Sequence, residues 1–100
     1  MPVVTVFRSR LRPDAGDRYH ATAARMLELA RAMPGFMDFK QFVAEDGERV
    51  SVITFASWDE QRAWRDHPEH RAAQRMGRER FYASYAITVC QVMEEHAFGG

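Results

Sequence analysis

Two histidines three residues apart, His67 and His70, are the side chains in this sequence best suited to accept a proton. Imidazole titrates near neutral pH and can therefore act as a general base. Pro68 interrupts a helix at His67, whereas His70 falls inside the helical stretch that follows, so His70 is the stronger catalytic candidate. The alternatives are structural: His67 bonds a backbone group at a helix boundary, and His70 lies on a helix surface beside Asp66 or Glu69.

The same two histidines could also hold a metal ion, because helical residues three apart can share one. Pro68 lies between them, however, and no third histidine or cysteine is close in sequence. The only cysteine, Cys90, falls in an apolar stretch that is typical of a core strand. The sequence therefore predicts no metal site and no disulfide.

Aromatic side chains gather where the last predicted helix meets the last predicted strand, at Phe81, Tyr82 and Tyr85. Flat rings at such a junction can line a pocket in which a flat ligand stacks. The alternative is ordinary packing in the core or between subunits, which is what we expect for Phe81. Tyr82 and Tyr85 are therefore candidate substrate-binding residues.

Four arginines precede these aromatic residues, a combination that can also bind nucleic acid. Interspersed glutamates and a formal net charge of zero, from 14 basic and 14 acidic side chains, favour a solvated helix face instead. The zero balance also removes the electrostatic attraction to anionic membranes. We therefore predict neither a nucleic-acid nor a membrane partner. The arginines are Arg71, Arg75, Arg78 and Arg80.

The length of 100 residues, with 46% hydrophobic, suits one domain with a core. No apolar run reaches the roughly 18 residues that span a membrane, and the apolar start is too short for a signal peptide. With a single cysteine, these features predict a cytoplasmic protein. We expect one domain over residues 1–100, with its core at about 3–94 and a flexible tail at 97–100.

The periodicity of apolar residues indicates which elements position these side chains. Apolar residues recur at helical spacing up to Met33, and Pro34 and Gly35 end that helix. The sequence predicts strands at 3–11, 36–45, 49–56 and 84–93, and helices from about 17 to 33, 58 to 65 and 68 to 82.

Two local motifs sharpen these boundaries. Asp46 and Gly47 favour a tight hairpin turn with a positive φ at both residues. Ser57 and Glu60 have the spacing of a capping box, in which the serine hydroxyl accepts a helical N–H and the glutamate reaches back. A helix is therefore expected to start at about Trp58.

The order βα, ββ, αβ is the split pattern of a ferredoxin-like α+β domain with a four-stranded antiparallel sheet. Helices on one face leave the other face of such a sheet open, yet the strands are apolar on both faces. In the second strand Phe36 and Phe42 alternate with Met37, Phe39 and Val43. A second copy of the chain is the simplest cover, so we predict a homodimer that forms a dimeric α/β barrel. The alternative is imperfect alternation on an exposed face.

Three segments of the chain resemble the antibiotic biosynthesis monooxygenase family. They are Met33-Pro34-Gly35-Phe36, Phe55-Ala56-Ser57-Trp58 and His67-Pro68-Glu69-His70, and the resemblance runs from about Val3 to Val92. It implies a small dimeric α+β barrel. Some members oxidise polyketide phenols to quinones with dioxygen and no cofactor, some degrade haem, and others bind or transform small molecules such as quinones, so the fold alone does not choose among them.

The resemblance to the cofactor-independent members implies a cavity with an aromatic wall. Trp58 matches the tryptophan that follows their third strand, and Trp64 falls where they carry a tyrosine. Thr54 stands in place of an asparagine. When the chain is compared with these members, Gln74 falls nearest to the position of their arginine. The other residues that could face the cavity are Arg71 and Arg75.

The haem-degrading members imply an asparagine in the first strand, a tryptophan in the helix after the third, and a histidine iron ligand about ten residues later. Trp64 fits the tryptophan, but Phe7 and Gln74 stand at the other two positions. Since two of the three positions differ, the resemblance disfavours haem chemistry.

We therefore predict a cofactor-independent monooxygenase that oxidises a small phenolic or quinonoid compound with dioxygen. Trp58 and Trp64 form its aromatic wall, His70 is the base or a hydrogen-bond donor, and Tyr82 orients the substrate. The alternative is a non-catalytic small-molecule binder or stress-linked accessory protein of the same fold. A roomy cavity beside Trp64 that holds His70 and Tyr82 favours the enzyme, and a cavity filled by Phe and Met side chains favours the alternative.

Overall fold

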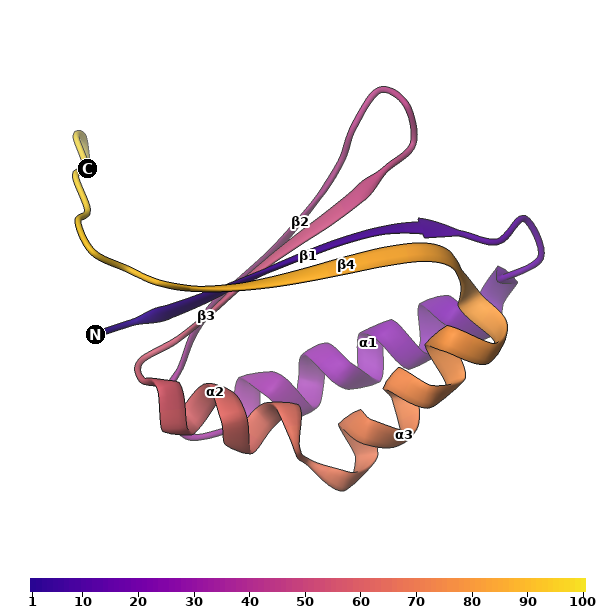
Figure 1. The fold of residues 1–100 in the computed structure, drawn as a ribbon, viewed down its shortest axis with the longest axis horizontal. Helices are drawn as coiled ribbons and strands as arrows, with labels where there is room; N and C mark the ends of the chain where they lie inside the picture. The colour runs from indigo at the N-terminus through magenta and orange to yellow at the C-terminus, as the bar shows by residue number, and fades with distance from the viewer.

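The segments rich in β-branched and aromatic residues form one antiparallel sheet in the computed structural model, which describes residues 1–100. Its strands are β1 (Val3–Leu11), β2 (Phe36–Val43), β3 (Arg49–Phe55) and β4 (Tyr82–Gln91), in the spatial order β2-β3-β1-β4. Figure 1 shows the four strands above a layer of helices. The predicted ferredoxin-like α+β fold is confirmed.

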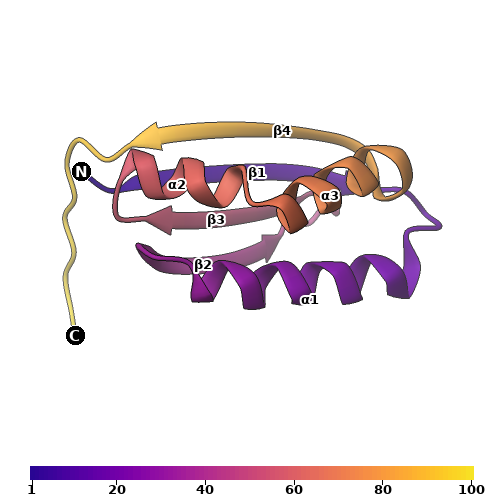
Figure 2. The same ribbon diagram turned by 90° about the horizontal axis from the view of Figure 1, so that it is seen from below.

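The helices are α1 (Gly16–Ala32), α2 (Trp58–Arg65) and α3 (Pro68–Met76), followed by a single π-helical turn, η1 (Gly77–Phe81). All of them lie on one face of the sheet (Figures 1 and 2). In Figure 2, α1 runs along the β2 side of the sheet, α2 and α3 lie beside it, and β4 forms the opposite edge. No helix has both the length and the apolar composition to cross a bilayer.

Arg12, just after β1, holds the π-helical turn in place. Its Nη1 and Nη2 donate to the carbonyl oxygens of Glu79 and Arg78 at 2.9 and 3.2 Å. Its Nε donates to the carbonyl of Tyr82 at 3.1 Å, and its backbone N–H donates to Phe81 at 2.7 Å. These are carbonyls that a helix end leaves without helical partners. The helix predicted to reach residue 82 therefore ends at 81, and β4 begins two residues earlier than expected, at 82 instead of 84.

Gly77 lets the ring of Tyr82 lie directly against this turn. A Cβ at Gly77 would come within 2.6 Å of the Tyr82 ring, closer than real Cβ contacts come. The backbone of Gly77 is helical, with φ −57° and ψ −49°, so space and not conformation requires glycine here. The turn thus fixes where Tyr82 enters the sheet.

The hairpin between β2 and β3 differs from the predicted turn. Gly47 has a positive φ of 89°, but no non-glycine residue does, so the prediction for Asp46 is wrong. The Gly47 N–H donates to the Ala44 carbonyl at 2.9 Å, which is the pattern of a three-residue loop that needs only one left-handed residue. The Asp46 carboxylate instead accepts the Glu48 N–H at 3.0 Å, a local bond that stabilises the observed turn.

The start of α2 follows the predicted cap. Ser57 Oγ accepts the Glu60 N–H at 3.2 Å, and the same hydroxyl donates to Glu60 Oε1 at 3.0 Å. The glutamate therefore reaches back to the serine hydroxyl. This reciprocal pair fixes the direction in which α2 leaves the sheet.

All the buried apolar side chains except Val3 form two separate clusters in the layer between sheet and helices. One contains Ala15, Tyr19 and Phe81, and the other contains Ala30, Phe55 and Trp64. Tyr19 and Ala30 are eleven residues apart on α1, which is about 17 Å along a helix axis. The core therefore supports the helices near both ends of α1 and leaves a space between.

The other face of the sheet carries no helix. Strand alternation places Val6, Val52 and Phe42 on it, and Phe42 is 51% exposed. Cys90, which pairs with Val4 on this face, is exposed as well, so its predicted place in the core is wrong for the single chain. The open face is thus apolar around Val6 and Val52 but also carries Arg8, Arg10 and Lys40, so the expectation of two apolar faces is met only in part.

Candidate functional site

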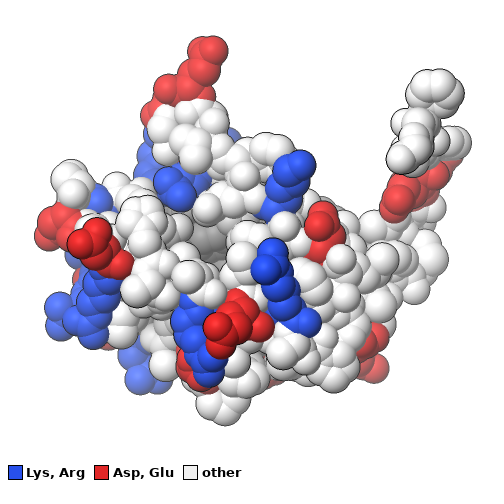
Figure 3. All heavy atoms as spheres, turned by 180° about the vertical axis from the view of Figure 1, so that it is seen from behind, with Lys and Arg blue, Asp and Glu red and all other residues white.

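A cavity of about 480 Å³ lies between the sheet and the helices. Its wall includes Tyr19 and Phe81 from one core cluster and Ala30 and Trp64 from the other. Figure 3 shows the surface hollowed near the middle of the face opposite to that of Figure 1, with mostly uncharged atoms around the hollow. The volume is in the range of small-molecule sites in proteins.

Strand alternation decides which sheet residues face this cavity. The pairs Thr5–Ile53 and Phe7–Ser51 are in register across β1 and β3, and all four side chains line the cavity. The neighbouring strands add residues of the same face, which are Phe39 and Gln41 from β2 and Tyr85, Ile87 and Val89 from β4. The sheet therefore supplies an apolar floor with a few hydroxyl and amide groups.

The helices supply a wall in which His70 stacks on Trp64. The two ring centroids are 3.9 Å apart with an interplanar angle of 11°, and Trp64 is 8% exposed. His70 Nδ1 lies 3.0 Å from the carbonyl oxygen of Trp64, an acceptor that requires a proton on Nδ1. The hydrogen bond thus selects one neutral tautomer, which leaves Nε2 as a lone-pair acceptor.

The surroundings of His70 keep this imidazole uncharged. Burial is the largest effect and lowers the pKa of His70 below its usual 6.5, whereas the bond to the Trp64 carbonyl raises it and the neighbouring His67 lowers it. At neutral pH the ring is therefore neutral and able to accept a proton at Nε2.

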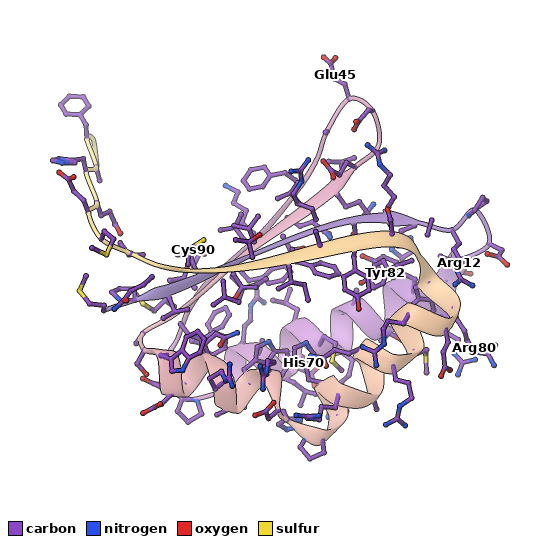
Figure 4. All side chains as sticks on the ribbon, in the orientation of Figure 1. Arg12, Glu45, His70, Arg80, Tyr82 and Cys90 are labelled. Atoms are coloured by element: carbon purple, nitrogen blue, oxygen red, sulfur yellow. The ribbon has the colours of Figure 1, made fainter.

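Tyr82 reaches the cavity from the sheet side. Figure 4 shows Tyr82 on β4 and His70 on the helix layer, with the space between sheet and helices separating them. The ring of Tyr82 meets the rings of Phe7 and Tyr85 at centroid distances of 5.3 and 5.8 Å. Burial raises the pKa of the Tyr82 hydroxyl above its usual range, and the neighbouring Tyr19 adds to the effect, so this group stays protonated.

Gln61 is a polar cavity residue that sequence analysis missed. It is 5% exposed, its Oε1 is fully buried without a partner, and its side-chain amide makes no hydrogen bond to the protein. A buried amide without partners destabilises a protein by about 1–3 kcal/mol, so native structures rarely retain one without a reason. The sequence could have indicated Gln61 as a cavity residue, because it lies three residues before Trp64 and therefore on the same face of α2.

Five of the predicted site residues are brought together around the cavity, and three are not. The five are Trp64, His70, Gln74, Tyr82 and Tyr85. Thr54 pairs with Val4 on the opposite face of the sheet. Trp58 is 50% exposed, with the Arg62 guanidinium 4.8 Å from its ring centroid, and Arg71 donates to Asp66 Oδ1 at 2.8 Å.

His67, the other histidine considered as a possible base, has a structural role. His67 Nδ1 accepts the Glu69 N–H at 3.1 Å and caps α3, so the interpretation as a helix-boundary residue is confirmed. No group of three or more His, Cys, Asp or Glu side chains is placed to hold a metal ion.

Comparison with known proteins identifies what the chain resembles. The model of the family described as antibiotic biosynthesis monooxygenase matches residues 2–76. An uncharacterised protein of Bacillus subtilis (strain 168), YqjZ, is 35% identical over 97 residues, which is 97% of this chain and 85% of the relative.

Two solved structures share the fold. Rv0793 from Mycobacterium tuberculosis superposes with a TM-score of 0.84 at 24% identity, covering 97% of this chain and 100% of that one. SnoaB from Streptomyces nogalater, described as a cofactor-independent oxygenase, gives a TM-score of 0.78 at 14% identity, covering 94% and 95%. At these identities the likeness shows a common fold.

Two of the three cavity glutamines, Gln61 and Gln41, should respond in opposite ways to the same substitution. Gln61→Met should raise the free energy of unfolding of the ligand-free protein by about 1 kcal/mol, because an amide without partners is removed. Gln41→Met should lower it by a similar amount, because both atoms of the Gln41 amide are hydrogen bonded. Urea unfolding followed by circular dichroism measures both.

A loss of stability in Gln61→Met equal to that in Gln41→Met would contradict this interpretation. It would mean that the Gln61 amide is satisfied in solution by the protein itself.

Proposed function

We propose a function from one premise: the chain belongs to the antibiotic biosynthesis monooxygenase family. We infer that the cavity is the active site of a cofactor-independent monooxygenase, which oxidises a small phenolic or quinonoid compound with dioxygen. The observation that carries this proposal is His70, a neutral imidazole stacked on Trp64 at the wall of an apolar cavity. A neutral imidazole beside flat apolar surfaces combines a proton acceptor with a place for a planar phenol.

The proposed reaction begins with transfer of the phenol proton to His70 Nε2. The resulting phenolate is electron-rich and can give an electron to dioxygen. For a phenol with a free para position, one oxygen atom becomes the second quinone oxygen and the other leaves as water. The substrate then supplies all four electrons, so atoms and electrons balance without an external reductant.

The cavity lining supports this chemistry in two ways. The stacked pair of Trp64 and His70 and the rings of Phe7 and Tyr85 offer flat apolar surfaces to a planar substrate. The protonated hydroxyl of Tyr82 can donate a hydrogen bond to a substrate oxygen and so orient it. A large apolar enclosure also strengthens each of these polar contacts.

The proposed partners, cofactor use and location of the protein are those expected from the sequence. A small aromatic molecule and dioxygen are the expected partners, with no cofactor. A cytoplasmic location stays a prediction that rests on the single cysteine.

We also propose that two copies pack through the open face of the sheet. That face presents Val6, Val52 and the half-exposed Phe42, an apolar surface that a second copy would cover. In this arrangement the two sheets face each other and the two cavities lie on the outer sides.

Oxygen uptake with acidic polycyclic phenols that have a free para position tests the activity. We expect His70→Gln to lower kcat/KM by about 10²- to 10⁴-fold, because the proton acceptor is lost. The matched control is His67→Gln, which changes a helix cap three residues away and should leave kcat/KM close to the wild-type value. Equal losses in both variants would contradict the role of His70.

The pH profile of kcat/KM gives an independent check on the same residue. Activity requires the neutral imidazole, so kcat/KM should fall as pH drops through the lowered pKa of His70, with an inflection below the usual 6.5. Above that inflection the profile should be flat until other groups titrate. A profile that keeps the same inflection in His70→Gln would assign it to another group.

Light scattering coupled to size exclusion tests the assembly. The wild-type protein should elute with about twice the chain mass of 11.6 kDa. Val52→Glu places a charge at the centre of the open face and should give monomers, whereas the control Ala72→Glu, on the exposed surface of α3, should stay dimeric. A wild-type monomer at micromolar concentration would refute the proposed dimer.

A further inference from the structure

Three side chains on β2 and β3 form a hydrogen-bonded chain that ends at the cavity. Arg49 Nη2 donates to Gln41 Oε1 at 3.2 Å, and Gln41 Nε2 donates to Ser51 Oγ at 3.3 Å. Arginine can only donate, so the Gln41 carbonyl must face Arg49 and its NH₂ must face Ser51. Since Ser51 Oγ accepts from Gln41, its own proton is free for another acceptor.

The register of the sheet directs this chain toward the ligand space. Gln41 lies opposite Ser51 and Val43 lies opposite Arg49 in the β2–β3 pair, so the three polar residues share the face that carries the helices. Ser51 is 6% exposed, and both Ser51 and Gln41 line the cavity. The free proton of Ser51 therefore sits at the floor of the cavity, out of bulk water.

Arg49 also differs from the arginines of the outer surface. Arg8, Arg10 and Arg25 each form an ion pair with a carboxylate. Arg75 and Arg80, which form none, are exposed to water, whereas Arg49 is partly buried and forms no ion pair. Its Nε is buried without a hydrogen-bond partner, and its guanidinium carbon lies 5.7 Å from the centroid of the Tyr19 ring, a cavity residue. A partly buried cation without a counter-ion is unfavourable, and an anion in the neighbouring cavity would compensate it.

We propose that Ser51, Gln41 and Arg49 form a subsite for the ionised oxygen of a flat aromatic ligand. Ser51 donates directly to that oxygen, and Arg49 polarises the Ser51 hydroxyl through Gln41. Ser51 is thus a binding residue, and Gln41 and Arg49 are positioning residues. The inference rests on the proposed function and deepens it, because it names the substrate class as acidic hydroxyaromatic or hydroxyquinone compounds, whose oxygen the subsite holds once that oxygen is ionised.

A purely structural role makes a different prediction. If the three residues only tie β2 to β3, their replacement changes stability and leaves ligand preference as it is. Selectivity between an anionic ligand and its neutral analogue therefore separates the two roles.

The test uses lawsone, a hydroxynaphthoquinone that is ionised at neutral pH, and its uncharged methyl ether. Calorimetric titration of the wild-type protein should show lawsone binding about tenfold more tightly than the ether, the size expected of a hydrogen bond to a charged group. Ser51→Ala and Arg49→Met should each remove most of that preference by weakening lawsone alone. Arg49→Lys should restore part of it, because the charge returns without the planar fork.

Ser9→Ala is the matched control. Ser9 is also a buried serine, 3% exposed, and pairs with Arg49 across β1 and β3, but it does not line the cavity. This variant should keep the wild-type preference. Loss of preference in Ser9→Ala equal to that in Ser51→Ala would assign the effect to the sheet and overturn the proposal.

Two further outcomes overturn the proposal. In the first, the wild-type protein shows no preference for lawsone over its ether, or binds neither compound at millimolar concentration. In the second, the preference for lawsone survives in Ser51→Ala. The proposed oxygenase fails separately. An anion preference that depends on Ser51 without any oxygen uptake would keep the subsite and reject the monooxygenase, and oxygen uptake that depends on His70 without that preference would do the reverse.

Discussion

The division of the core into two clusters is the constraint on which the rest of the structure depends. Ala15, Tyr19 and Phe81 hold the helices at one end of α1, and Ala30, Phe55 and Trp64 hold them at the other. Because α1 is a continuous helix fixed near both ends, the layer between them cannot close without bending it. The cavity is therefore a consequence of where the large side chains are placed, and polar groups such as Ser51 and Gln61 are shielded from bulk water without being buried in a packed core.

Those polar groups fall on two opposite walls. The helix side carries a proton acceptor, His70 Nε2, in a tautomer that the Trp64 carbonyl selects. The sheet side carries hydrogen-bond donors, the hydroxyls of Ser51 and Tyr82, and behind Ser51 a cation without a counter-ion. A base on one wall and donors on the other suit a ligand that loses a proton and keeps the negative charge. Arg12 and Gly77 matter to this arrangement because they set the position at which Tyr82 joins the sheet.

The sequence predicted the order of strands and helices along the chain, because apolar periodicity and strong local signals such as Ser57 determine it. Of the five cavity residues, Trp64 and Gln74 came from the family resemblance, and His70, Tyr82 and Tyr85 came from their residue types and positions. The sequence misplaced Thr54 because adjacent residues on a strand face opposite sides of the sheet, so the register places Thr54 with Val4 on the open face. It misplaced Trp58 because residues six apart on a helix, such as Trp58 and Trp64, face different directions. Helix spacing put Gln61 beside Trp64, but only the structure shows that its amide lacks a partner. The Arg49–Gln41–Ser51 chain joins two strands, so its existence depends on a cross-strand register that no local pattern specifies.

The central claim is that the space between sheet and helices is a site for a flat acidic ligand and not a packing defect. A crystal structure of the protein grown with lawsone tests this most directly. We expect the ring system to lie between the two core clusters, with its ionised oxygen at hydrogen-bond distance from Ser51 Oγ and with His70 Nε2 facing the ligand. A ligand bound elsewhere, with Met26 and Leu27 closed over the space that they line here, would contradict the claim.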